Sequence, residues 1–208
     1  MPVKNDREYR RIDLENIECR DDENGKIVEG YATVFGNEYL LYSLGDYEVR
    51  ESFDHDSFAE ADVSDTIMQY DHEGRVFARV SNGTLEIQPD EHGLHIRANL
   101  GGTDIGRELY DEIRGGYTNK MSIGFTVAKQ EKAEERTANK TIIHRKITGV
   151  KKLYDVSAVS LPANDATEIS ARNLGEGVIA EVEKERLAEM ERQRKIKKIK
   201  LLMEVNTK

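Results

Sequence analysis

Apolar and polar residues alternate in short runs through the first hundred positions, which is the period of a half-buried β-strand. Turn-forming residues separate the runs. Asn82-Gly83 is a strong signal for a two-residue hairpin, and residues 89–93 form a second turn. We therefore predict strands at residues 27–35, 66–70, 75–80, 84–88 and 94–100.

One later segment has a helical period instead. Thr103 or Asp104 can cap its first turn, because a short polar side chain accepts a hydrogen bond from the free N–H groups there. Gly115-Gly116 ends it. Its apolar side chains recur at every fourth position, namely Ile105, Leu109 and Ile113.

Strand patterns return at residues 122–127, 142–153 and 154–161, the last of them stopped by Pro162. Residues 129–140 are highly charged. We expect this stretch to form a surface loop or flap, because charged side chains are costly to bury. The pattern as a whole predicts a mainly β fold with helices (α+β), mostly antiparallel.

The composition changes after Gly175-Glu176-Gly177 to residues that favour helices. Acidic residues come first and basic residues follow, which is the order that the helix dipole favours. Apolar residues do not hold one stripe along this segment. A charged helical tail is therefore expected, and a long two-stranded coiled coil is disfavoured.

Length and charge limit the class of protein. The 208 residues fit one compact domain with an appendage. A formal net charge of −9 argues against a surface that binds nucleic acid through its phosphates. No run approaches the ~18 apolar residues of a membrane span, and the first residues lack an apolar signal region. We expect no membrane or specific nucleic-acid partner.

Cys19 is the only cysteine, which excludes an internal disulfide and fits a reducing cytoplasm. A metal site built from Asp71-His72-Glu73 with His92 and His95 is disfavoured, because two histidines on either side of Gly93 are unlikely to share a helix face. We expect no metal and no cofactor.

Three short stretches carry the groups of a serine protease: Ser122 in an apolar run, His72 in a turn, and Asp155 near the end of the last strand pattern. A serine hydroxyl is a weak nucleophile that needs an imidazole to take its proton and a third group to orient that imidazole. Two of these residues also have a plain structural interpretation: Ser122 as a buried serine on a strand, and His72 as a solvated histidine in a turn. Ser122 lacks a glycine two positions before it, so it does not form the nucleophile elbow of α/β-hydrolases.

Five motifs occur in order along the chain: Gly30-Tyr31-Ala32-Thr33-Val34-Phe35; Gly45-Asp46 with Phe53 and Ser57-Phe58; Tyr70-Asp71-His72; Met121-Ser122-Ile123-Gly124-Phe125; and Asp155-Val156-Ser157-Ala158-Val159-Ser160-Leu161-Pro162-Ala163-Asn164. Together they resemble the prohead protease family of tailed phages (caudoviruses), which is related in fold to the herpesvirus maturation protease, assemblin. The resemblance implies an antiparallel, β-barrel-like serine protease domain at residues 27–171. An N-terminal segment (1–26) precedes it and the helical tail (172–208) follows.

The resemblance also implies roles. Ser122 matches the position of the nucleophile, and His72 that of the general base. Asp155 matches an acidic position where the family more often has glutamate. His144 is the alternative third member, because the herpesvirus relatives use a second histidine; we favour Asp155.

Two further expectations concern the surroundings of these residues. On a regular strand Asp155 shares a face with Leu153, so a carboxylate there needs a partner. The Gly115-Gly116 turn, just before the nucleophile strand, offers backbone N–H groups for an oxyanion.

The function that the resemblance implies is that of a serine endopeptidase inside the phage procapsid, in the cytoplasm of a bacterial host. Its partners are then scaffold or the scaffold-like region of the major capsid protein, as substrate, and the protease itself. The alternative is a catalytically inactive capsid-assembly or scaffold protein that uses the β domain and the tail for contacts, including self-association.

Overall fold

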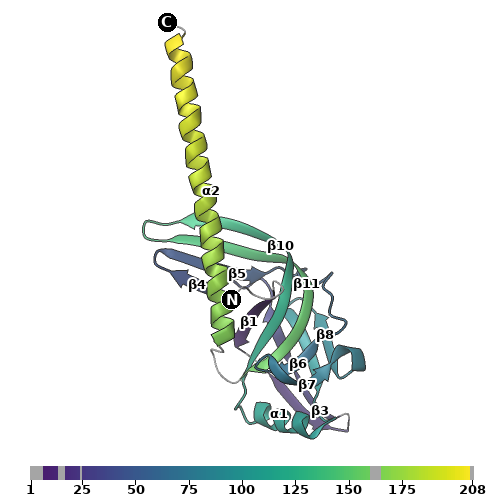
Figure 1. The fold of residues 1–208 in the computed structure, drawn as a ribbon. Helices are drawn as coiled ribbons and strands as arrows, with labels where there is room; N and C mark the ends of the chain where they lie inside the picture. Colours follow the sequence, from purple (N-terminus) through teal and green to yellow (C-terminus); the bar gives the residue numbers. More distant parts are fainter. Residues whose placement is uncertain (1–6, 14–16, 24, 160–164, 207–208) are drawn as a thin grey trace.

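The computed structural model describes residues 7–13, 17–23, 25–159 and 165–206. Most of the described chain folds into two open β-sheets (Figure 1). The larger has the order β1-β10-β11-β5-β4, with β6 joined to β11 and β7 joined to β6. Its strands are β1 (Glu8–Asp13), β4 (Tyr39–Leu44), β5 (Tyr47–Phe53), β6 (Ile67–Tyr70), β7 (Glu73–Arg79), β10 (Lys120–Arg136) and β11 (Thr141–Val159).

The smaller sheet has the order β2-β3-β9-β8. Strand β11 runs parallel to β5 and β6, and the remaining pairs are antiparallel. The mainly β fold is thus confirmed. A closed barrel is not, since both sheets of described strands are open. The four strands are β2 (Glu18–Asp22), β3 (Gly25–Val34), β8 (Leu85–Pro89) and β9 (Gly93–Asn99).

The main apolar core draws side chains from both sheets, among them Ile96 of β9, Phe125 of β10 and Val156 of β11. A second, smaller apolar cluster is built around Val49 and Ile143. Burying these side chains supplies the main driving force for folding.

Between the two apolar clusters lies a buried group of charges, which we call the arginine–glutamate cluster: Glu8, Arg10, Glu51 and Arg145. On β5, Glu51 sits between Val49 of the small cluster and Phe53 of the main core, at alternate positions that share a face. Arg10 Nη2 lies 2.9 Å from Glu51 Oε2, and Arg145 Nη2 lies 2.9 Å from Glu8 Oε1. The cluster therefore ties β1 to β5 and β11.

The predicted internal helix is confirmed as α1 (Asp104–Arg114). Thr103 is the capping residue, because its hydroxyl accepts a hydrogen bond from the Gly106 N–H at 3.1 Å. Leu109 and Ile113 are buried, so the four-residue period correctly marked the inner face.

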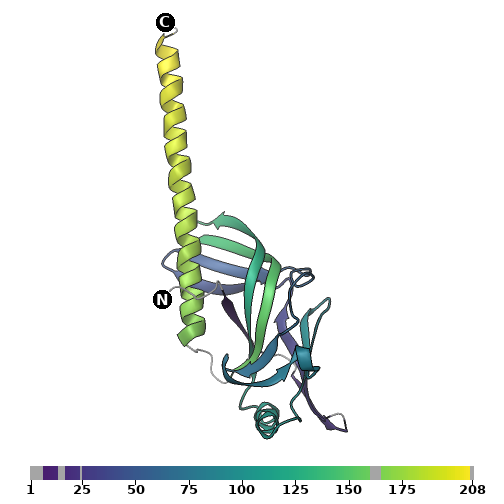
Figure 2. The same cartoon turned by 45° about the vertical axis from the view of Figure 1, so that its right-hand side comes forward.

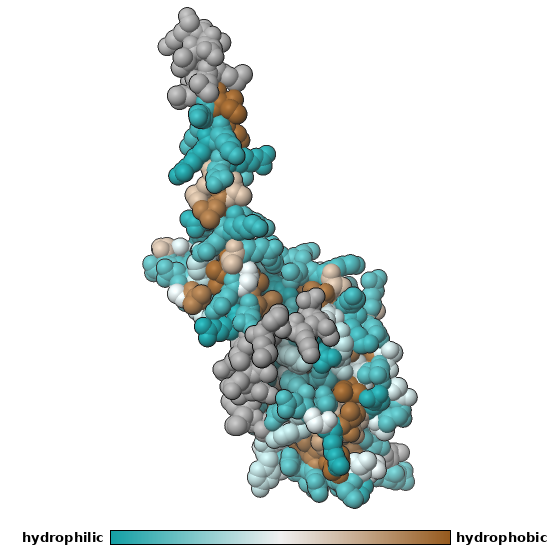
Figure 3. Space-filling view, viewed as in Figure 1, coloured by the Kyte–Doolittle hydropathy of each residue, from teal (hydrophilic) through white to brown (hydrophobic). Residues whose placement is uncertain are grey.

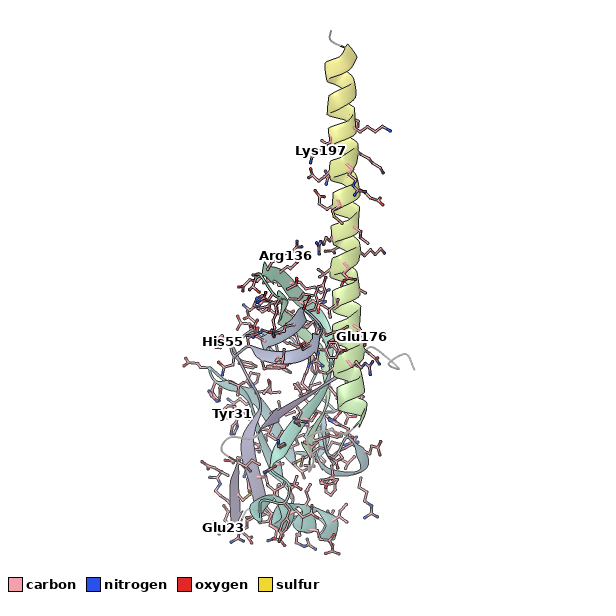
Figure 4. The ribbon with its side chains drawn as sticks, turned by 90° about the vertical axis from the view of Figure 1, so that its left-hand side faces the viewer. Glu23, Tyr31, His55, Arg136, Glu176 and Lys197 are labelled. Carbon is pink, nitrogen blue, oxygen red and sulfur yellow. The ribbon has the colours of Figure 1, made fainter. Side chains whose placement is uncertain are left out.

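Two loop predictions are wrong. Residues 129–140 do not form a flap: β10 continues through them to Arg136 and pairs with the start of β11, making a long hairpin that extends beyond the core (Figure 4). Charged side chains are tolerated there because this part of β10 is exposed and its backbone hydrogen bonds go to β11.

Asn82-Gly83 does not close a two-residue hairpin either. Strand β7 pairs with β6 and β8 pairs with β9, so the turn connects the two sheets. A short 3₁₀ helix (Val80–Asn82) precedes Gly83, which adopts a left-handed conformation with φ +75°. The local turn signal was correct, but it does not specify which strands pair.

The C-terminal helix α2 (Asp165–Asn206) begins before Gly175-Glu176-Gly177 and continues through it, so the expected helix start is wrong. Gly175 is buried, and an added Cβ would overlap the ring of Tyr42. Val178 and Ile179 complete the small apolar cluster. The first part of α2 is therefore packed on the sheet.

The rest of α2 projects away from the sheets (Figure 2), and Lys197 lies beyond the hairpin tip at Arg136 (Figure 4). Its surface is largely hydrophilic with separate apolar patches (Figure 3). The exposed apolar side chains of this helix include Leu187 and Ile199. Among the described residues, no helix has the length and apolar character needed to cross a membrane.

Candidate active site

His72 lies in the tight turn between β6 and β7. Both Asp71 and His72 are left-handed, with φ of 48° and 62°, a conformation that costs a non-glycine residue roughly 1–2 kcal/mol. The Asp71 N–H donates to the Ala158 carbonyl at 3.0 Å, which anchors the turn to β11. The turn thus holds the imidazole over the neighbouring strands.

Ser122 and Asp155 come from those strands, β10 and β11. Ser122 pairs with Ser157, and Gly124 pairs with Asp155, so all four share one face of the sheet. Ser122 and Asp155 are 1% and 2% exposed. This face is opposite to the one that carries Ile123, Phe125 and the main core.

The structure brings the three predicted residues into one hydrogen-bonded chain. His72 Nε2 lies 2.5 Å from Ser122 Oγ, and His72 Nδ1 lies 2.6 Å from Asp155 Oδ1. An ionised carboxylate only accepts hydrogen bonds, so we assign the proton to Nδ1, which leaves Nε2 to accept from the serine hydroxyl. This is the protonation state that a general base needs.

Asp155 is held by more than His72. The Ser157 hydroxyl donates to the same oxygen, Oδ1, at 2.8 Å. The other oxygen, Oδ2, is buried and has no hydrogen-bond partner within the described part of the chain, and Arg7 Nη1 lies 3.8 Å from it. An added Cβ at position 124 would overlap Oδ2, so Gly124 leaves the space that the carboxylate fills.

The expected surroundings of Asp155 need one correction. Leu153 pairs with Phe125, while Asp155 pairs with Gly124, so β11 carries one extra residue at this point. This β-bulge turns Leu153 into the core and Asp155 to the opposite face. The carboxylate therefore faces polar groups and not the apolar neighbours that regular alternation predicted.

A fourth side chain, Tyr9 of β1, packs edge-on against His72 with ring centroids 4.5 Å apart. Sequence reasoning missed it. Residues 8–13 precede every motif that pointed to the site, and only the long-range pairing of β1 with β10 brings Tyr9 there.

The alternative third residue, His144, lies elsewhere. It pairs with Ala133 in the outer part of the hairpin, its Nδ1 lies 2.6 Å from Glu38 Oε1, and its Nε2 lies 3.5 Å from Glu135 Oε2. In this arrangement Asp155, and not His144, is hydrogen-bonded to His72.

The remaining histidines are also apart from the chain of three. His92 and His95 both pack against the ring of Tyr31, and His55 packs against Phe35. Over the part of the chain that the structure describes, no three His, Cys, Asp or Glu side chains are grouped so as to hold a metal ion.

The proposed oxyanion groups of Gly115-Gly116 are already used. The Gly115 N–H donates to Asp111 O at 2.9 Å, and the Gly116 N–H donates to Ile113 O at 3.0 Å. These bonds close the C-terminal end of α1, as is usual where a helix stops at glycine. The turn therefore does not offer these N–H groups to a substrate.

A carboxylate, an imidazole and a hydroxyl in this order are the groups of a serine hydrolase. The chain belongs to the caudovirus prohead serine protease family, whose model matches residues 15–178. Among solved structures it is similar to the bacteriophage T4 capsid assembly protease, gp21, with 14% sequence identity and a TM-score of 0.41; the match covers 74% of this chain and 99% of that chain. No curated protein matches the sequence significantly.

Proposed function

We propose that this chain is the endopeptidase of procapsid maturation, with Ser122 as the nucleophile, His72 as the base and then the acid, and Asp155 as the group that orients His72. The observation that carries the proposal is the hydrogen-bonded chain from Asp155 through His72 to Ser122, at 2.6 and 2.5 Å. Membership of the prohead serine protease family supports it.

The geometry allows the two proton transfers of acyl transfer. Ser122 Oγ attacks the scissile carbonyl while Nε2 of His72 takes its proton, and the same nitrogen then protonates the leaving amine. Asp155 stabilises the imidazolium that forms between these steps. Water then attacks the acyl-enzyme carbonyl while His72 takes its proton, and His72 returns the proton to Ser122 Oγ as the ester bond breaks and the acid product leaves.

The substrates in this proposal are scaffold or the scaffold-like region of the major capsid protein, and the protease itself, inside the procapsid. Irreversible cleavage there removes internal protein and frees the shell to expand. The non-enzymatic alternative, a scaffold protein with the same fold, gives no reason for a strained histidine turn aimed at a buried serine.

The test is co-expression with the capsid partner, comparing wild type with Ser122→Ala. Loss of one hydroxyl hardly changes packing, so particles should assemble with uncleaved precursor and full-length protease. Ser57→Ala is the matched control, because Ser57 is also buried and its hydroxyl has no hydrogen-bond partner among the described residues. Normal processing by Ser122→Ala would refute the serine mechanism.

Self-processing is read from the same particles by mass spectrometry. Wild-type protease should lose part of residues 172–208, and Ser122→Ala should keep them. Since α2 is continuous through Gly175-Glu176-Gly177, the cut is expected in the projecting part of the helix and not at these glycines. Full-length protease in matured wild-type particles would make the helix a permanent element.

A further inference from the structure

The N-terminal strand β1 lies before the family match at residues 15–178, yet it borders the candidate active site. It pairs with β10 so that Tyr9 is opposite Gly124 and Arg11 is opposite Ser122. Directly opposite residues of an antiparallel pair point to the same face. The side chains of Tyr9 and Arg11 therefore stand on the face that carries Ser122.

Tyr9 is the residue of β1 whose ring packs against the histidine. Its ring meets the imidazole at an interplanar angle of 62° with centroids 4.5 Å apart, the edge-to-face geometry that aromatic pairs prefer. The imidazole is thus contacted by Ser122 at Nε2, by Asp155 at Nδ1 and by the Tyr9 ring at its side. The side chain of His72 is only 9% exposed as a result.

The turn anchors the backbone of His72 to β11, but it does not fix the rotation of the imidazole ring. Asp71 and His72 are both left-handed, so the turn is strained and depends on contacts made by its surroundings. Without Tyr9 the side of the ring is open, and the imidazole can rotate away from Ser122 while the turn relaxes.

Side-chain contacts on both faces of β1 hold the strand in place around Tyr9. On its own face, Arg7 Nη1 donates to the Tyr9 hydroxyl at 3.3 Å, and the Arg7 guanidinium lies 3.8 Å from the centre of the Tyr154 ring. On the opposite face, Glu8 and Arg10 belong to the buried arginine–glutamate cluster. The strand is thus anchored where it carries the ring.

We propose that β1 is part of the catalytic apparatus and that Tyr9 is a positioning residue, whose ring keeps the imidazole of His72 in line with Ser122. This inference rests on the proposed serine mechanism. It assigns a role to residues that precede the matched region of the family.

The experiment uses the full chain and a fluorescent fluorophosphonate probe, which needs no known peptide substrate. Ser122 Oγ forms a bond to phosphorus, the phosphorus–fluorine bond breaks, fluoride leaves, and His72 takes the hydroxyl proton. The rate of labelling at saturating probe therefore reports the alignment of His72 with Ser122, while the half-saturating concentration reports binding.

Tyr9→Ala should lower the saturating labelling rate about 10- to 100-fold, the scale expected for a small misplacement of a catalytic group, with little change in half-saturation. Tyr9→Phe should restore the rate to within a few-fold of wild type, since it keeps the ring. Tyr31→Ala is the matched control, because Tyr31 makes the same kind of edge contact, 4.5 Å between centroids, with His92 in the turn between β8 and β9. It should label like wild type.

The outcomes separate the two proposals. If wild type does not label at Ser122, the proposed function fails. If wild type labels and folded Tyr9→Ala labels equally fast, the role of Tyr9 is refuted. Thermal unfolding identifies a variant that does not fold; in that case Tyr9→Leu replaces it, and a wild-type rate for Tyr9→Leu would refute the proposal equally.

Discussion

Two buried polar clusters meet at β1 and differ in how completely their groups are paired. The arginine–glutamate cluster lies on the core face, where all four carboxylate oxygens of Glu8 and Glu51 accept hydrogen bonds from arginine. The candidate active site lies on the other face, where one buried oxygen of Asp155 has no hydrogen-bond partner among the described residues and Arg7 lies 3.8 Å away.

The difference separates a structural cluster from a reactive one. Two arginines and two glutamates balance their charge, and a fully satisfied buried network favours one arrangement of strands. The candidate active site instead combines a strained turn at His72 with a carboxylate oxygen that has no hydrogen-bond partner among the described residues. Proteins retain such costs mainly at functional sites, where the strain positions a group.

The largest effect is expected from breaking the reactive cluster at Asp155. Asp155→Asn should reduce the labelling and cleavage rates roughly 10⁴-fold, because an amide neither fixes the Nδ1 proton nor stabilises the imidazolium. His144→Gln is the control and should keep most activity, since His144 contacts Glu38 and Glu135. Rates are measured with the fluorophosphonate probe; the reverse ranking would move the role to His144.

The three central residues of the candidate active site could be predicted from the sequence, but the residues around them could not. Short sequence motifs contain Ser122, His72 and Asp155, and the chemistry of these side chains can be inferred without a structure. Tyr9 and Arg7 carry no local signal, because their role depends on β1 pairing with a strand more than a hundred residues away. The bulge that turns Asp155 from the core also depends on pairing and not on local alternation.

The fold shows the same limit. Helix α1 was predictable because its period, cap and terminal glycines are local. Asn82-Gly83 identified a turn but not the strands that it joins. Gly175 suggested a break in the helix, whereas the glycine is needed because the ring of Tyr42 packs against the helix backbone.

The second effect concerns the structural cluster. Glu51→Gln should lower the free energy of unfolding by about 3–5 kcal/mol, because it leaves buried arginine charge uncompensated. Glu86→Gln removes an exposed partner of Arg97 and should change stability by less than about 1 kcal/mol. Urea denaturation measures both. Equal effects of the two substitutions would show that the buried cluster does not stabilise the fold.

The same cluster predicts a pH dependence. Burial opposes ionisation of Glu51, but the charges of Arg10 and Arg145 outweigh it, so the pKa of this carboxyl lies below its ordinary value of 4.5. A group with a lowered folded-state pKa stabilises the protein above the unfolded value and loses that contribution as pH falls through the folded value. Wild type should therefore lose stability on acidification below about pH 4.5, and Glu51→Gln should lose less over the same range.

The smallest effect is expected where α2 touches neither cluster. Ending the chain after Glu191 removes the basic, projecting part of the helix (Figure 2). This should change the free energy of unfolding and the labelling rate only within error, because the side chains of residues 192–199 are all exposed.

Two isoleucines on the same helix provide the matched comparison. Ile179 is 6% exposed and belongs to the small apolar cluster. Ile179→Ala should lower the free energy of unfolding by about 2–4 kcal/mol. Ile199 is 57% exposed, so Ile199→Ala should lower the free energy of unfolding by less than about 0.5 kcal/mol. Chemical denaturation of the two variants at equal protein concentration measures both losses. An equal loss for Ile199→Ala would mean that the projecting helix is packed against another surface in solution. The contacts of α2 within this chain would then not be the only ones that stabilise it.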